Sequence, residues 1–300
     1  MIDPDYSAML ASARRHPEQW RIFAILAVGL FVMMLGTPLF FLVVGSAASE
    51  LNVVALGRNH IPRLGVTPGG AFVVFSSFVV MIGATWLTAK RLNARGLRDI
   101  TGPAARLRAD FVTCGKWVVG ITALTMLLPW DHAEMEFVAQ YTSSQWLFWL
   151  PLALLGLMIQ VTAEEMFFRG YLQTQITGAT GSIALGILFS ALVFGIGHLG
   201  ARDGVGTAGM IFPVIWAVAF GLVAGDLTAR SGSIGPAIAL HLVHNATAML
   251  IAPHEDLLSG FGLFVRTGGI ASAYSDPLVM LFESLHLLVL WLTVRIALRR

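Results

Sequence analysis

The sequence predicts an all-α polytopic membrane protein with about eight transmembrane helices and a buried polar chamber. Three observations support this fold class. First, 56% of the residues are hydrophobic and only 12% are charged, whereas a soluble domain is about 25% charged. Second, the chain contains eight apolar stretches long enough to cross a bilayer. Third, lysine and arginine gather in the segments that would face one side of the membrane.

Each span is identified by a run of roughly 20 mostly apolar residues, the length that crosses the hydrocarbon core. In chain order the predicted spans are residues 22–45, 70–89, 111–130, 146–168, 182–199, 207–225, 234–252 and 277–294. Residues 1–21 are expected to be a cytosolic N-terminal segment, because they are charged and lack the pattern of a cleavable signal peptide. Residues 22–300 are expected to form a single membrane domain, since no repeat or linker divides them.

The distribution of basic residues predicts the orientation of the chain. If the N-terminus is cytosolic, fourteen basic residues fall in inside segments and four in outside loops. The inside group comprises Arg14, Arg15, Arg21, Lys90, Arg91, Arg95, Arg98, Arg106, Arg108, Arg169, Arg230, Arg295, Arg299 and Arg300. The outside group comprises Arg58, Arg63, Arg202 and Arg266. This bias predicts that both termini are cytosolic, in the plasma membrane if the cell is bacterial. The net charge of +2 follows from it and indicates no nucleic-acid partner.

The longest inside stretch is KRLNARGLRDITGPAARLRAD, residues 90–110. Its basic residues alternate with leucines, a pattern that favours contact with anionic lipid headgroups. A role as an orientation signal alone explains the stretch equally well. Membrane lipids are therefore one expected partner.

Few strongly polar side chains lie inside the predicted spans. An ionised group near the centre of a bilayer costs about 3 kcal/mol on insertion scales, so such residues are candidates for function. They are Glu164 and Glu165 in the fourth span, His198 in the fifth, His241, His244 and Asn245 in the seventh, and Glu283 and His286 in the eighth.

The spacing of these residues groups them on helix faces. Glu165 and Arg169 are four residues apart, which suits an ion pair along one helix. Glu164 then lies one position round the helix without that partner, and is available as a general base. His241 and Asn245 are also four apart and share a face. The depths along the predicted helices overlap enough for these groups to meet in one chamber.

Other interpretations of the polar residues remain open. Polar side chains on facing membrane helices can serve only to hydrogen-bond one another, for about 0.6 kcal/mol each. That interpretation suits a single histidine better than the whole set, and Glu283 with His286 stays open as a local pair. A proton-coupled transporter or a non-catalytic membrane scaffold is also compatible with buried polar groups. The absence of an evident inverted repeat counts against the transporter.

Three motifs follow one another, each on its own predicted span: EEMFFRG at residues 164–170, FGIGH at residues 194–198 and HLVHN at residues 241–245. In this order they resemble the signatures of the CAAX-protease and bacteriocin-processing (CPBP) family of intramembrane endopeptidases. The resemblance covers about residues 146–252, which would form a CPBP-like catalytic core. The layout of eight spans is similar to that of the type II CAAX prenyl endopeptidases of this family.

The resemblance implies hydrolysis of peptide bonds inside the membrane. Glu164 would activate a water, His198 and His241 would assist it, and Asn245 would stabilise the oxyanion. Supporting roles would fall to Glu165, Arg169, Phe194 and His244. The implied substrate is a protein or peptide, either lipidated or with a membrane-embedded C-terminal tail.

Metal dependence is not decided by the sequence. Two histidines and a glutamate are a common zinc set with water as the fourth ligand, so Glu164, His198 and His241 stay open as ligands. Against zinc, no acceptor is evident that would fix the tautomers of the histidines, and no cofactor is firmly predicted. HEDLL at residues 254–258 lacks the second histidine of a metalloprotease motif, and VAGDLT at residues 223–228 lacks the first glycine of an aspartyl-protease motif.

Overall fold

The computed structural model describes residues 3–47, 54–56, 62–128, 136–199, 207–255, 258–267 and 277–299. In the N-terminal part, α2 (Trp20–Phe31) continues through the π-helical segment η1 (Val32–Gly36) into α3 (Thr37–Ala47). The other helices of this part are α1 (Pro4–Ala13), α4 (Pro68–Ser76), α5 (Val79–Asn93), α6 (Leu97–Thr101) and α7 (Ala104–Thr125).

The C-terminal part begins with α8 (Ser143–Glu165), which continues through the π-helical segment η3 (Met166–Gln173) into α9 (Thr174–Thr180). The helices that follow are α10 (Ile183–Ile196), α11 (Thr207–Ser231), α12 (Gly235–Ala246) with its π-helical extension η4 (Thr247–Ile251), the 3₁₀ turn η5 (Ser259–Phe261) and α14 (Pro277–Ala297). Two short antiparallel pairs complete the described chain: β1 (Val54–Leu56) with β2 (Pro62–Leu64), and β3 (Phe137–Ala139) with β4 (Phe264–Arg266).

The predicted fold class is confirmed, because the described chain is all-α and carries apolar helices of spanning length. Each predicted span overlaps a helix or, for residues 70–89, the two consecutive helices α4 and α5. Within the described residues, five helical stretches are long and apolar enough to cross a membrane: Trp20–Val44, Pro68–Asn93, Ser143–Thr180, Ile211–Ser231 and Pro277–Ala297. The predicted spans at 182–199 and 234–252 are the shorter apolar helices Ile183–Ile196 and Gly235–Ile251. The predicted span at 111–130 overlaps α7, which begins earlier, in the basic stretch, and ends at Thr125; residues 129 and 130 lie outside the described residues.

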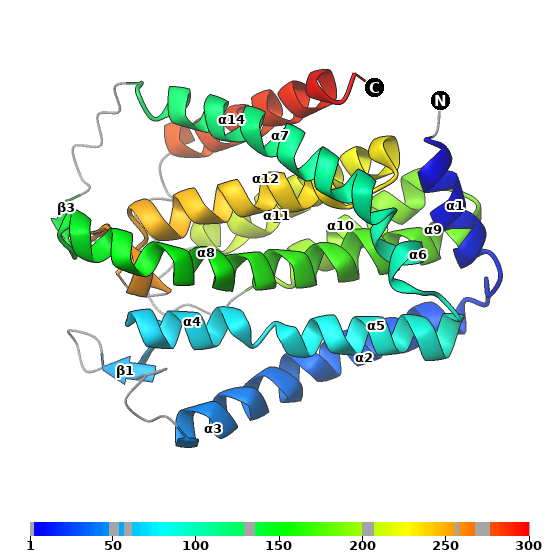
Figure 1. The fold of residues 1–300 in the computed structure, drawn as a ribbon, viewed down its shortest axis with the longest axis horizontal. Coiled ribbons are helices and arrows are strands. Elements are labelled where there is room, and N and C mark those ends of the chain that lie inside the picture. The colour runs from blue at the N-terminus through cyan, green and yellow to red at the C-terminus, as the bar shows by residue number, and fades with distance from the viewer. Residues whose placement is uncertain are drawn as a thin grey trace.

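The helices run roughly along one direction and stack in layers (Figure 1). Both marked chain ends lie at one end of the bundle, and β1 and β3 lie at the opposite end (Figure 1). These are called below the terminal end and the sheet end. Helices α7, α10 and α12 therefore run from the terminal end toward the sheet end, whereas α8, α11 and α14 run back.

The N-terminal helix α1 is part of the packed bundle. Asp3 caps it by accepting a hydrogen bond from the backbone N–H of Asp5. Tyr6, Met9 and Leu10 are buried, and α1 packs against α9 and α11. The helix thus covers the terminal end of the bundle, while the predicted division of the chain at residue 21 stays a prediction.

A buried arginine joins α1 to the terminal ends of other helices. The Arg95 guanidinium is fully buried, and burial lowers the pKa of Arg95 to about 10. It donates hydrogen bonds to Ser12 Oγ (3.1 Å), Asp99 O (2.7 Å), Thr174 Oγ1 (2.8 Å) and Gln175 Oε1 (3.3 Å). Because these acceptors come from α1, α6 and α9, a single cation ties the three helices together.

Candidate active site

The carboxylates of the first motif lie where α8 passes into η3. Glu165 and Arg169 form the predicted ion pair, with Arg169 Nη1 3.1 Å from Glu165 Oε1, and their side chains are 0% and 1% exposed. A π-helical turn such as η3 widens the helix and commonly marks a functional site. Glu164 does not take part in this pair, and its Oε2 is buried without a hydrogen-bond partner in the described chain.

Glycine at position 170 lets the basic stretch approach this turn. A Cβ atom at Gly170 would lie 2.1 Å from the carbonyl oxygen of Ile100 in α6. Any larger residue would therefore push α6 away from η3. This close approach of two backbones explains why the motif EEMFFRG ends in a glycine.

Aromatic rings surround the guanidinium of Arg169. Its Cζ lies 4.3 Å from the ring centroid of Phe194, 5.5 Å from that of Phe220 and 5.8 Å from that of Phe168. Cation–π contacts of this kind are worth about 0.5–2 kcal/mol. Phe194, predicted as a supporting residue, contacts the buried cation of the first motif directly.

His241 of α12 lies between the two glutamates. Its Nδ1 is 2.7 Å from Glu165 Oε1, and its Nε2 is 3.6 Å from Glu164 Oε2. Since Glu165 accepts hydrogen bonds, the Nδ1 atom carries a proton and donates it. The Nε2 atom is then directed toward Glu164. Glu165 is thus the acceptor that fixes the ring of His241, a partner that the sequence did not reveal.

Asn245, one turn further along α12, is held by a residue that the sequence analysis missed. Its Nδ2 donates a hydrogen bond of 2.9 Å to Gln160 Oε1. Gln160 lies on α8 one turn before Glu164, and both side chains of the bond are buried. A glutamine four residues before Glu164 inside an apolar span was the available signal.

The other two histidines reach the same region by different contacts. His198 follows the end of α10; its Nδ1 lies 2.8 Å from the carbonyl oxygen of Phe194 and its ring 4.6 Å from the Phe194 ring. His244 stacks on Trp216, with ring centroids 4.3 Å apart. Among the described contacts, none joins His198 directly to Glu164.

A cavity of about 540 Å³ lies beside these residues. His198, His241, His244 and Asn245 all line it. Glu164 is not among the lining residues, but its Oε2 lies 3.6 Å from Nε2 of His241, which is one of them. The predicted polar chamber is therefore present, and its volume falls within the range of about 300–1,000 Å³ that is usual for ligand sites.

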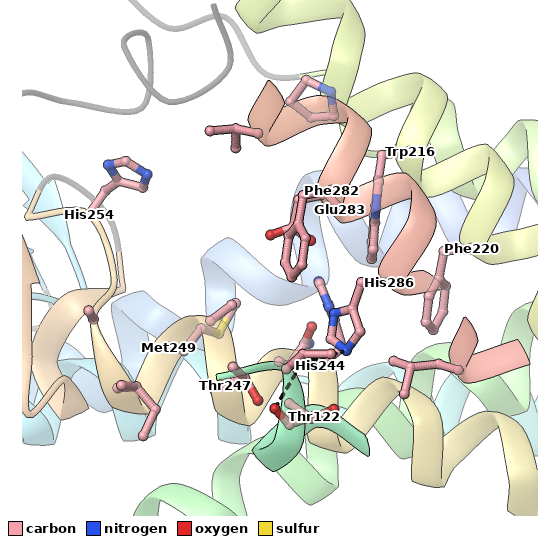
Figure 2. A pocket seen from close by; sticks show the side chains of 18 of the residues that line it. Thr122, Trp216, Phe220, His244, Thr247, Met249, His254, Phe282, Glu283 and His286 are labelled. Atoms are coloured by element: carbon pink, nitrogen blue, oxygen red, sulfur yellow. Dashed lines mark hydrogen bonds between the residues drawn. The ribbon is translucent and has the colours of Figure 1, made fainter. Parts of the chain in front are cut away.

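Helix α14 supplies the opposite wall of the cavity. Phe282, Glu283 and His286 line it together with Trp216 and His244 (Figure 2). His286 Nε2 lies 3.4 Å from Thr125 Oγ1 of α7. Its described polar contact is therefore with α7. No described contact links His286 to Glu283, so the local pair considered in the sequence analysis is not seen among the described residues.

The candidate zinc ligands do not converge. Among the residues that the structure describes, no group of three His, Cys, Asp or Glu side chains is close enough to hold a metal ion. Glu164 and His241 are neighbours, but His198 is turned toward the carbonyl of its own helix. The residues present therefore do not fit the zinc set.

Fold and site together define an all-α integral membrane protein with acidic, imidazole and amide side chains at an internal cavity. Residues 145–247 match the family model of the type II CAAX prenyl endopeptidases, described as Rce1-like. The resemblance to this group of CAAX proteases is thus confirmed for the segment that contains all three motifs.

One curated protein is also similar to the chain. The chain is 25% identical over 201 residues to YyaK of Bacillus subtilis (strain 168), described as an uncharacterized protein. The match covers 64% of this chain and 65% of YyaK. No solved structure matches the chain.

Proposed function

We propose that the protein is an intramembrane endopeptidase that hydrolyses peptide bonds of membrane-associated or lipidated substrates with a water activated by Glu164. The observation that supports this most directly is the position of His241. Its ring is held by Glu165 on one side, faces Glu164 on the other, and lines the cavity. A carboxylate base next to an oriented imidazole can activate a water without a covalent nucleophile.

In the proposed reaction Glu164 takes a proton from the water. The oxygen of that water attacks the peptide carbonyl carbon, and a tetrahedral oxyanion forms. When the carbon–nitrogen bond breaks, Glu164 returns the proton to the leaving amine. His241 orients the water through Nε2, and the ion pair of Glu165 with Arg169 keeps the ring in place.

Asn245 is the proposed oxyanion donor. An asparagine amide carries two N–H donors, and Gln160 uses one of them. The second is available for the oxyanion, and Gln160 fixes its direction. A single donor of this kind is worth about a hundredfold or more in kcat in other enzymes.

The substrate is proposed to be a protein or peptide segment that enters the cavity from the membrane. Aromatic side chains such as Phe212, Trp216 and Phe282 line the cavity and suit apolar residues of the substrate. We further propose that both termini are cytosolic and that membrane lipids contact the basic stretch at residues 90–110.

The test uses purified protein in detergent with a quenched-fluorescence peptide that carries an apolar segment. We expect cleavage by the wild type and at least a hundredfold lower kcat for Glu164→Gln, while Glu136→Gln is unchanged. Glu136 is an exposed glutamate that does not line the cavity. A transporter or scaffold would leave the peptide intact, and equal cleavage by wild type and Glu164→Gln would exclude the proposed base.

A further inference from the structure

Side-chain hydroxyls support the π-helical segment η3. A π-helical segment is rare in proteins and departs from the hydrogen bonding of an α-helix. In η3 the carbonyl oxygen of Phe168 accepts a 2.7 Å hydrogen bond from Ser190 Oγ of α10. The carbonyl oxygen of Gly170 accepts a 2.5 Å hydrogen bond from Thr174 Oγ1 at the start of α9. Hydroxyl groups thus bind two backbone oxygens in the segment that directly follows the two glutamates.

The guanidinium of Arg95 orients one of these hydroxyls. Its Nη2 donates a 2.8 Å hydrogen bond to Thr174 Oγ1 and a 2.7 Å hydrogen bond to the carbonyl oxygen of Asp99. A hydroxyl group has a single proton, so Thr174 accepts from Arg95 and keeps that proton for the backbone of η3. Asp99 belongs to α6, the helix whose Ile100 carbonyl lies against Gly170. Arg95 thus holds both sides of the close contact between α6 and η3.

The N-terminal helix α1 is bound by the same guanidinium. Arg95 Nε donates a 3.1 Å hydrogen bond to Ser12 Oγ, and Nη2 lies 3.5 Å from the carbonyl oxygen of Met9. Nη1 donates to Gln175 Oε1 of α9, and Gln175 Nε2 donates in turn to the carbonyl oxygen of His16, just after α1. Helices α1, α6 and α9 lie together at the terminal end (Figure 1). The docking of α1 and the shape of η3 are therefore linked through one side chain.

The chemistry of this contact indicates a role beyond stability. Arg95 is fully buried, and its described hydrogen-bond acceptors are hydroxyl, amide and peptide oxygens without a formal charge. Because burial of a charge away from a counter-ion is costly, stability alone does not account for an arginine here. The guanidinium supplies a rigid fork of five N–H donors, which fixes the directions of its acceptors. Its Cζ also lies 5.7 Å from the ring centroid of Tyr171 in η3.

The position of η3 is transmitted to the proposed catalytic groups. Gly170 follows Arg169 in the chain, and Arg169, counted with the inside segments in the sequence analysis, lies buried in the bundle. Its Nη1 is 3.1 Å from Glu165 Oε1, the same atom that lies 2.7 Å from Nδ1 of His241. A shift of η3 therefore moves the ion pair and the imidazole ring that it holds. A misplacement of about 1 Å can cost a factor of about 100 in rate.

We infer that Arg95 is a positioning residue for catalysis and that α1 belongs to the catalytic unit. The guanidinium fixes η3, and η3 keeps Glu165 and His241 in the geometry that orients the attacking water. The inference rests on the proposed function, because it concerns the rate of that hydrolysis. Arg95 does not line the cavity, so its effect falls on turnover and leaves the binding of substrate unchanged.

The first test replaces Arg95 and measures cleavage of the quenched-fluorescence peptide. Arg95→Met removes the fork of donors and keeps a long side chain, and Arg98→Met is the matched control. Arg98 is an exposed arginine of α6 in the same basic stretch. We expect Arg95→Met to lower kcat about tenfold or more with KM within about twofold of the wild-type value. Arg98→Met should change neither constant.

Thermal unfolding separates this effect from a loss of folded protein. All rates are measured below the unfolding midpoint of every variant. A purely structural role of Arg95 would lower the midpoint of Arg95→Met and leave kcat of the folded protein at the wild-type value. That result would overturn the inference.

A double-mutant cycle tests the route through Thr174. Thr174→Val removes the hydroxyl between Arg95 and η3, and Thr180→Val, which loses a similar hydroxyl-to-carbonyl bond in α9, is its control. We expect Thr174→Val to lower kcat about threefold or more. The double variant with Arg95→Met should match Arg95→Met alone within about twofold. Losses that multiply would show independent effects and refute the inference. If Arg95→Met does not fold, a wild-type kcat in Thr174→Val would refute it instead.

Hydrogen exchange in η3 supplies a readout that does not need activity. Peptides that cover residues 166–173 should exchange about tenfold faster or more in Arg95→Met than in the wild type, and Arg98→Met should match the wild type. Cleavage by the wild type, with neither exchange nor kcat changed in Arg95→Met, would refute the inference and keep the protease. Equal cleavage or none by wild type and Glu164→Gln would refute the proposed function, and the catalytic role of Arg95 with it.

Discussion

Replacement of Glu165 by glutamine tests the division of labour between the two adjacent glutamates. In the structure one oxygen of Glu165 receives hydrogen bonds from both Arg169 and His241. Glutamine keeps an oxygen there but removes the charge, so the Arg169 cation stays buried without a counter-ion. Glu164→Gln, by contrast, removes no hydrogen bond found in the described chain.

The size of the effect follows from the burial of the pair. Removal of one partner of a buried ion pair costs about 3–5 kcal/mol. Because glutamine retains an acceptor for Arg169, we expect the lower end, about 3 kcal/mol. At about 2–4 °C per kcal/mol for a chain of this size class, the midpoint of thermal unfolding falls by roughly 6–12 °C. Glu164→Gln should unfold within about 2 °C of the wild type, a change of under 1 kcal/mol.

The assay is thermal unfolding in detergent, followed by the fluorescence of the eight tryptophans, together with abundance in the membrane. A double variant, Glu165→Gln with Arg169→Met, removes the orphaned cation and should recover at least about half of the lost stability. It should stay inactive, because His241 still lacks its carboxylate. If Glu165→Gln is as stable as Glu164→Gln, or if the double variant recovers nothing, the ion-pair reasoning is wrong.

Three further predictions address catalysis and topology. Asn245→Ala should lower kcat about a hundredfold with little change in KM, because it removes a donor used in the transition state; Asn245→Asp should be worse, and a change confined to KM would contradict the oxyanion role. Gln160→Leu should lower kcat about tenfold or more through Asn245 alone, so no further loss is expected in the double variant with Asn245→Ala. Reporters at residues 100 and 300 should behave as cytosolic and one near Glu136 as extracytoplasmic; an extracytoplasmic signal at residue 100 would reverse the orientation.

The sequence was informative where a local rule applied. Apolar runs of spanning length predicted the long helices, because the bilayer demands about 20 apolar residues whatever the neighbours are. They did not predict the short helices α1 and α6. The pairing of Glu165 with Arg169 was predicted because residues four apart on a helix are neighbours by geometry. The same rule grouped His241 with Asn245, both of which line the cavity.

These local rules could not predict which side chains of different helices would contact one another. Nothing in the local pattern indicated that Glu165, rather than Glu164, would hold Nδ1 of His241, since a rotation of α8 by one residue would exchange them. Gln160 was passed over for the same reason: its partner Asn245 lies 85 residues away in the chain. The sequence could not judge the possible zinc set of Glu164, His198 and His241 either: the residue types are suitable, but no three such side chains gather closely enough in the described part of the structure.

What the sequence by itself determined is the membrane setting of this protein, the positions of its long apolar helices and the residue types available for chemistry. These follow from composition and period, which act on each segment separately. Only the tertiary structure decided which of those residues meet, and that His241 lies between the two glutamates and lines the cavity. Those features depend on how helices pack against one another, and packing is settled by side chains far apart in the chain.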